Sequence, residues 1–265
     1  MKIALKLAYL GDGYYGFQRQ PGLATVEFEV REALCRIGVV GGDFCYAGRT
    51  DRGVSALGQV IDFWIDEKSS HLARPRCING RLPRDIWAWA WAEAPLGFSA
   101  RWSAQWREYR YFLWHPGLEI KKMREAAGLL LGRHDFRNFS SEKRDTMREI
   151  LKLDISEADG MTILDVRANG FLWNMTRKIV CALEKVGSGE RGLEWILELL
   201  DPEINRGAPT APAQGLVLRE VGYDGLQWQV DEYSRRRAAL ALGETVQKRM
   251  AGAAAAREMQ KAMEF

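Results

Sequence analysis

Residues 47–56 place two arginines, a threonine and an aspartate in a short connection between two predicted β-strands. The preceding Phe44-Cys45-Tyr46 and the following run 59–65 are rich in the aromatic and β-branched residues that strands favour. Gly48 and Gly53 allow backbone conformations that a side chain would forbid. The chain is therefore expected to build a sheet in which a tight, charged loop joins two strands.

The charges of this loop suit chemistry on a phosphate-bearing substrate. A carboxylate held among guanidinium groups stays ionised, because a nearby opposite charge favours its charged form. Asp51 can then act as a nucleophile or a base, while Arg49 and Arg52 bind phosphate. The spacing alone favours a second interpretation, in which Asp51 caps Thr50 or pairs with an arginine only to stabilise the turn.

Composition restricts the remaining classes of function. The 265 residues suffice for one large or two small domains, and the formal net charge of +3 does not by itself indicate nucleic-acid binding. Four scattered cysteines and three separated histidines predict neither a disulfide framework nor a metal site. Without a signal peptide or an apolar run long enough to span a bilayer, we expect a cytoplasmic protein with no membrane contact.

The first part of the chain, residues 1–102, is predicted to form an α/β lobe. An alternating strand opens it, and a helix is expected from Thr25, a suitable N-cap, to Gly38. Residues 86–92 alternate tryptophan with alanine and predict a strand with its three indoles on one face, packed against helices.

Residues 103–225 are predicted to form a second lobe with the same rough strand–helix–strand order. Strands are expected at 107–114, 150–156 and 161–168, with Asp159-Gly160 as a hairpin turn. A helix is expected from about 172 to 186, and a last strand ends the lobe. The fold class is thus α/β (α+β), with two RRM-like lobes of largely antiparallel sheet flanked by helices and an active-site cleft between them.

Residues 226–265 differ in composition and are predicted to form a helical extension in two pieces. Three consecutive arginines precede an alanine-rich stretch with apolar residues spaced by four. Packing on the body, a subunit contact and a contact with RNA are all compatible with this pattern.

The charged loop also resembles a family signature. Gly48-Arg49-Thr50-Asp51-x-Gly53-Val54 is similar to the catalytic loop of the TruA-type tRNA pseudouridine synthases, in which the aspartate is catalytic. Four further segments resemble the family in the same order, so that the resemblance spans residues 3 to about 223. These segments are Tyr9-x-Gly11-Asp12-Gly13-x-Tyr15-Gly16-Phe17-Gln18-x-Gln20, Phe98-x-Ala100-Arg101 with Arg107-x-Tyr109-x-Tyr111, residues 170–180 and Gly215-Leu216-x-Leu218.

The resemblance implies roles for six residues. Asp51 is the implied catalytic residue, and Tyr109 is implied to stack on the target base, although a strand tyrosine by itself more often packs in a core. Arg177 is implied to pair with Asp51 or to hold a substrate phosphate, and Arg49 to bind phosphate or help extrude the nucleotide. Gln18 and Gln20 are candidate RNA contacts.

The reaction implied by the resemblance is the conversion of uridine to pseudouridine in the anticodon stem-loop of tRNA, at positions 38–40. The carboxylate either attacks the sugar or removes a proton to form a glycal, and the sequence leaves both routes open. No metal, nucleotide or other cofactor is implied. The family implies a homodimer as well as the tRNA partner, and Gly53-Val54-Ser55 looks more like archaeal and eukaryotic members than like bacterial ones.

Two other functions remain compatible with the residues. A non-catalytic RNA-binding module of RRM-like lobes would use the aromatic residues as platforms and Asp51 as a loop cap. A phosphate-ester hydrolase would use the same loop but would normally need a metal site.

Overall fold

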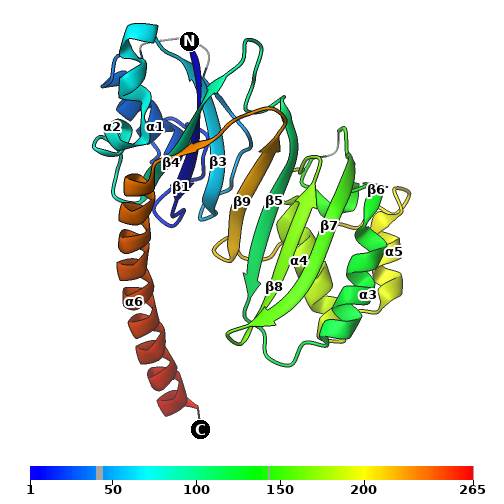
Figure 1. Ribbon diagram of the computed structural model, residues 1–265. Helices are drawn as coiled ribbons and strands as arrows, with labels where there is room; N and C mark the ends of the chain where they lie inside the picture. Colours follow the sequence, from blue (N-terminus) through cyan, green and yellow to red (C-terminus); the bar gives the residue numbers. More distant parts are fainter. Residues whose placement is uncertain (40–43, 143, 265) are drawn as a thin grey trace.

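The computed structural model describes residues 1–39, 44–142 and 144–264, and its centre is one ten-stranded sheet (Figure 1). The strand order is β10-β4-β1-β3-β9-β5-β8-β7-β6, and β2 pairs with β3 off this path. In the described residues every pairing is antiparallel except that of β3 with β9. The predicted α/β fold with largely antiparallel strands and flanking helices is confirmed.

The strands and helices follow the predicted segments closely. The strands are β1 (Lys2–Tyr9), β2 (Cys45–Tyr46), β3 (Ser55–Trp64), β4 (Ile86–Ala94), β5 (Ala104–Leu113), β6 (Gly132–Asp135), β7 (Met147–Ala158), β8 (Met161–Ala168), β9 (Leu216–Tyr223) and β10 (Gln229–Val230). The helices are α1 (Val26–Cys35), α2 (Pro75–Asn79), α3 (Ile120–Leu130), α4 (Met175–Gly187), α5 (Leu193–Leu200) and α6 (Glu232–Met263), with 3-10 turns at Glu67–Ala73 and Arg137–Phe139. None of the helices in these described ranges is long and apolar enough to cross a membrane.

The two halves of the chain share this one sheet, whereas the sequence predicts a separate sheet for each half. They join where β3 and β9 run parallel for a short stretch, with Ser55 opposite Val217 and Ala56 opposite Leu218. Gly58 permits the close approach, because a Cβ at this position would lie 2.4 Å from the carbonyl oxygen of Arg219. The charged loop ends at this junction and is fixed by both halves.

We propose a division of the chain into two lobes and an extension at the predicted positions, because the strands fall into these three groups. Residues 1–102 supply β1 to β4, and residues 103–225 supply β5 to β9. The extension from residue 226 returns to the first half, where β10 pairs with β4. Its last residue, Phe265, lies outside the described residues.

The main core lies on the face of the sheet covered by α1 to α5, with Ile78 of α2 among its members. β1 places Ile3, Leu5 and Leu7 in this core, and the buried residues of α4 pack into the same cluster. A second, smaller cluster lies on the opposite face, where Ala238 of α6 packs against Trp87 and Ala8.

The three alternating tryptophans do not share one face, contrary to the prediction. The pairing of β1 with β4 shifts so that Lys6 lies opposite Ala90 and Leu7 lies opposite Ala88, which leaves an extra residue at Trp89. A bulge of this kind reverses the alternation of side chains. Trp91 therefore packs in the main core, while Trp87 and Trp89 contact the cluster beneath α6.

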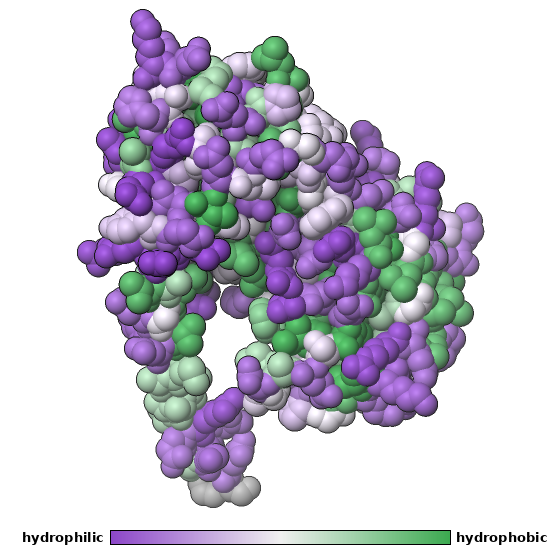
Figure 2. Space-filling view, viewed as in Figure 1, coloured by the Kyte–Doolittle hydropathy of each residue, from purple (hydrophilic) through white to green (hydrophobic). Residues whose placement is uncertain are grey.

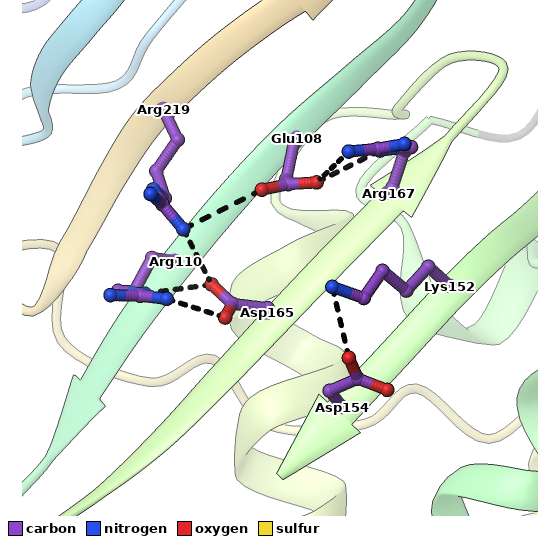
Figure 3. A network of polar contacts seen from close by, with 7 residues as sticks. All are labelled: Glu108, Arg110, Lys152, Asp154, Asp165, Arg167 and Arg219. Atoms are coloured by element: carbon purple, nitrogen blue, oxygen red, sulfur yellow. Dashed lines mark hydrogen bonds and ion pairs between the residues drawn. The ribbon is translucent and has the colours of Figure 1, made fainter. Parts of the chain in front are cut away.

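Opposite the main core, the second half of the sheet carries a network of charges (Figure 3). Arg110 donates to both carboxylate oxygens of Asp165, at 2.7 and 2.6 Å, and Arg219 lies between Asp165 and Glu108. Burial opposes ionisation of Asp165, but the hydrogen bonds and charge of Arg110 outweigh it and lower its pKa. The other members of the network are Arg167, Lys152 and Asp154.

The C-terminal extension is a single helix, not the two pieces predicted. In the described residues, only Ser234 and Ala238 of the 32 residues of α6 are buried, because the helix packs on β4 through its first turns and then extends past the sheet (Figures 1 and 2). An ion pair of Arg249 with Asp12 and the stacking of Arg257 over Trp114, 4.7 Å from the ring centroid, connect its distal part to the body.

The close approach at the junction of the two halves predicts a specific effect on stability. Gly58→Ala is expected to lower the free energy of unfolding by roughly 1–3 kcal/mol, because main-chain atoms of β9 occupy the space of the new methyl group. Urea denaturation followed by circular dichroism measures this change. The control is Gly128→Ala in α3, where no atom lies within 4 Å of the added Cβ and a gain of about 0.5–1 kcal/mol is expected. Equal stability of the Gly58 variant and the wild type would contradict this account of the junction.

Candidate active site

A cleft of about 830 Å³ lies where the two halves meet, and all six residues singled out in the sequence line it. Its walls come from the loop after β1, the loop before β3, the beginning of β5 and the segment that leads into α4. Asp51, Arg49, Tyr109, Arg177, Gln18 and Gln20 are distributed over these walls. The topology thus brings together residues that are up to 159 positions apart in the sequence.

Hydrogen bonds on both sides of Thr50 hold the charged loop in place. The Tyr9 hydroxyl and Thr50 Oγ1 are 2.8 Å apart in the buried core, and the Phe17 amide donates to the Thr50 carbonyl at 3.0 Å. Gly16, at a φ of 96°, permits this contact, because a Cβ there would lie 2.8 Å from the same carbonyl oxygen. The loop is therefore held by β1 and by the loop that follows it.

Asp51 follows Thr50 and faces the cleft, where it meets Arg177 of the other half. Arg177 Nη1 donates to Asp51 Oδ2 at 3.1 Å, and the two side chains are 28% and 18% exposed for Asp51 and Arg177, respectively. In the described part of the chain Asp51 Oδ1 accepts no hydrogen bond, so this oxygen remains available to a substrate.

Arg177 itself is oriented by two further contacts. Its Nε donates to the Ala211 carbonyl at 2.7 Å, and its Nη1 also donates to Asn174 Oδ1 at 3.0 Å. The helix α4 begins at Met175, three residues later than predicted, because Asn174 takes a left-handed conformation at a φ of 64°. Arg177 therefore lies in the first turn of the helix, where its side chain reaches across the cleft.

Arg107 is a second connection between the halves, and the sequence analysis did not assign it a role. Its guanidinium donates to the carbonyl oxygens of Ala47, Arg101, Ala104 and Asn169, at 2.6–3.4 Å. Burial lowers its pKa, since the partners are main-chain carbonyls and not carboxylates. Arg107 thus links the beginning of the charged loop, at Ala47, to the start of β5 and to the residue that follows β8. Its place in the Arg107-x-Tyr109-x-Tyr111 motif was the available signal.

Tyr109 lies on β5, in the cleft wall. Only 7% of the residue is exposed, and its ring meets Phe171 edge-to-face at a centroid distance of 4.9 Å. Burial, with Tyr9 and Asp51 nearby, raises its pKa, so the phenol stays neutral. Tyr111 points to the same side but is held in the core, where its hydroxyl donates to the Pro212 carbonyl at 3.0 Å.

The other predicted residues lie at the rim. Arg49 Nε is 3.4 Å from the Tyr46 hydroxyl, and Gln20 donates to the Tyr15 carbonyl at 3.1 Å. Gln18 is exposed and lines the same wall.

Four rim residues escaped the sequence analysis as site residues. Trp102 and Trp173 are large exposed indoles, 78% and 58% exposed, and come from different halves of the chain. Arg101 and Arg148 add positive charge beside them. Six arginines and two acidic residues line the described cleft, so it presents a net positive surface with aromatic edges, as suits a nucleic-acid backbone and its bases. Arg101 and Trp173 lie within the matched motifs and Trp102 directly follows one, which was the available signal, whereas Arg148 lies in none of them.

Comparison with known proteins identifies the family of the chain. A family model described as tRNA pseudouridine synthase matches residues 126–224. A protein named tRNA pseudouridine synthase A from Methanothrix thermoacetophila is 60% identical over 263 residues, covering 99% of this chain and 98% of the relative. This chain belongs to the tRNA pseudouridine synthase A family.

More distant family members extend the same pattern. The tRNA pseudouridine synthase A of Methanocella arvoryzae is 47% identical with 90% of each chain covered, and that of Archaeoglobus fulgidus is 42% identical with 88% of each covered. These relatives are archaeal, as the Gly53-Val54-Ser55 variant led us to expect. Among solved structures, a chain of a Cbf5-Nop10-Gar1 complex is similar at a TM-score of 0.40 and 12% identity, covering 82% of this chain and 49% of that one, which is too distant to add to the assignment.

The buried tyrosines of this site predict how stability depends on pH. Burial raises the pKa of Tyr9 to about 12, above the value near 10 of an unfolded tyrosine. As the pH rises, the unfolded chain therefore loses this proton before the folded chain does. The free energy of unfolding falls by on the order of 2 kcal/mol between about pH 10 and pH 12. Urea denaturation at pH 8, 10 and 11 should show this decline in the wild type and a smaller decline in Tyr9→Phe. An equal decline in both proteins would contradict the assignment to Tyr9.

Proposed function

We propose that this chain isomerises uridine to pseudouridine in tRNA, with Asp51 as the catalytic residue. The observation that carries the proposal is the setting of Asp51, a half-buried carboxylate with one free oxygen in a cationic cleft, held by Arg177 from the opposite half. Membership of the tRNA pseudouridine synthase A family supports the activity.

The reaction exchanges one glycosidic bond for another without net addition or loss of atoms. The bond from N1 to C1′ breaks, the base rotates, and a bond from C5 to C1′ forms, while C5 loses a proton and N1 gains one. Asp51 Oδ1 either attacks C1′ and is later displaced by C5, or removes the proton on C2′ to give a glycal and returns a proton to C2′ when C5 bonds to C1′. Both routes need an ionised carboxylate beside the sugar, and neither is preferred by the geometry.

The surrounding residues have complementary parts in this proposal. Arg177 fixes the orientation of Asp51 through Oδ2, and the Tyr109 ring offers a flat, neutral surface for the extruded base. Arg49 is placed to bind phosphate at the rim, with Gln18 and Gln20 as polar contacts for RNA. Extruding a base costs a few kcal/mol, and stacking and phosphate contacts offset that cost.

The target uridines are proposed to lie in the anticodon stem-loop, at positions 38–40, on the family resemblance alone. The same resemblance supports a homodimer and a reaction without metal or nucleotide cofactor, and a tRNA substrate fits the cytoplasmic location predicted from the sequence. A non-catalytic RNA-binding module is not favoured. An aspartate that only caps a turn would use its carboxylate oxygens for local hydrogen bonds, whereas among the described residues Asp51 leaves one oxygen free toward the cleft.

The proposed role of Asp51 is tested by the release of tritium from C5-tritiated uridine in a tRNA transcript. Asp51→Asn keeps the size of the side chain and a hydrogen-bond acceptor for Arg177, but removes the charge, so release should fall by on the order of 10³-fold or more while tRNA binding persists. Glu142→Gln is the matched control, since Glu142 is the other acidic residue of the described cleft. Comparable activity of wild type and Asp51→Asn would refute catalysis by Asp51, and no release by wild type from any transcript would refute the activity.

The two rim tryptophans give a separate prediction. Trp102→Ala and Trp173→Ala should each raise KM for tRNA by roughly 5–150-fold, since stacking is worth about 1–3 kcal/mol per base, with little change in kcat. Steady-state kinetics measure the division between KM and kcat. Trp114→Ala is the control, because Trp114 is 56% exposed but lies outside the cleft lining. An equal effect of all three substitutions would contradict a specific role of the rim.

A further inference from the structure

A second basic surface lies outside the cleft, where α2 and the turn after it meet the beginning of α6. We call it the α2–α6 surface and define it by six exposed arginines from two segments that are far apart in the sequence. None of the six lines the cleft. They are Arg76, Arg81, Arg84, Arg235, Arg236 and Arg237.

Side-chain contacts join the two segments into one surface. The Arg76 guanidinium lies 4.5 Å from the centroid of the Tyr233 ring, and its Nε is 4.0 Å from Asp231 Oδ2. Residues 80–85 lead from α2 into β4, and α6 packs on the same strand through Ala238 and Trp87. In Figure 2 hydrophilic side chains surround the first turns of α6, and a less polar surface follows further along the helix.

The positive charge of the chain is concentrated here. Residues 74–85 and 231–237 contain seven arginines and three acidic residues, a formal charge of +4, whereas the whole chain carries +3. All three carboxylates are engaged locally, and Glu232 pairs with Arg235 of the surface at 3.0 Å. Asp85 accepts a hydrogen bond from the Tyr14 hydroxyl at 2.7 Å, and Asp231 caps α6 by accepting from the Ser234 amide at 2.7 Å.

Several of these arginines have their charge available. Within the described ranges, Arg84, Arg236 and Arg237 make no ion pair, in contrast to the arginines of the network on the second half of the sheet. Exposed, unpaired guanidinium groups on a rigid framework suit phosphate oxygens, which they bind through paired hydrogen bonds. Phosphate contacts of this kind supply affinity without reading sequence.

The position of the surface separates it from the reaction. α2 is joined to β4 by hydrogen bonds of Asn79 with Ala88, and α6 packs on β4 through Ala238. β1 lies between β4 and the junction of β3 with β9 where the cleft opens. An RNA that reaches both sites must therefore extend well beyond the nucleotide that enters the cleft. We propose that the α2–α6 surface binds the phosphate backbone of the substrate tRNA outside the stem-loop that carries the target uridine. This inference rests on the proposed function.

The experiment compares Arg236→Ala/Arg237→Ala with Lys121→Ala/Arg133→Ala. The control pair is equally exposed and removes the same charge from α3 and β6, away from the surface. With full-length tRNA, KM of the first variant should rise about ten-fold at unchanged kcat, and the dependence of log Kd on log salt should weaken by roughly 0.7–0.9 per lost contact. With an isolated anticodon stem-loop, both variants should behave as the wild type.

Several results would overturn the inference. Equal losses in the two variants, or an equal loss with the stem-loop and full-length tRNA, would show that the surface has no specific contact with the rest of the tRNA. Unchanged tRNA affinity together with a smaller assembly in gel filtration would make it a contact between protein chains. Filter binding in an Asp51→Ala background separates this inference from the proposed function, because it measures tRNA affinity without turnover. If adding the two arginine substitutions to the Asp51→Ala variant leaves tRNA affinity unchanged, the proposed tRNA contact of the α2–α6 surface is refuted, whether or not the protein is an isomerase.

Discussion

The parallel pairing of β3 with β9 is the contact on which the site depends. It involves only Ser55 with Val217 and Ala56 with Leu218, yet it makes one sheet from two halves of the chain. A parallel pair needs a long connection between its strands, and here more than 150 residues intervene. The charged loop ends at this pairing, so the orientation of Asp51 relative to the second half is set by the sheet itself.

Arg107 and Arg177 add side-chain contacts between the two halves to the pairing of β3 with β9. Arg107 gathers main-chain carbonyls from three segments, and Arg177 bridges Asp51, Asn174 and Ala211. Arginine suits both positions, since its planar group offers several donors in fixed directions. The same residue type therefore supplies structure at the base of the cleft and charge for binding at its rim.

Charge is distributed unequally over the molecule. On the open face of the second half, arginines are neutralised by Glu108 and Asp165 within the sheet (Figure 3). In the cleft and on the α2–α6 surface, arginines outnumber the carboxylates that face them. A chain with a small net charge can thus present two strongly basic surfaces, because its acidic residues are engaged elsewhere.

The sequence by itself determined the local features, because they depend on neighbouring residues. The helix after Thr25, the hairpin at Asp159-Gly160 and the charged loop between two strands all follow from helical periodicity and from turn and strand preferences, although the Thr25 side chain makes no capping hydrogen bond. The motifs indicated the family and the candidate residues. Only the tertiary structure decided what depends on distant contacts. The pairing of β3 with β9, the bulge at Trp89, the late beginning of α4 at Asn174 and the carbonyl partners of Arg107 each depend on a segment remote in the sequence. Alternation could not predict the faces of the tryptophans, since a bulge is set by the register of two strands and not by one. For the same reason, the arginines of α2 and α6 form one surface only because both helices pack beside β4.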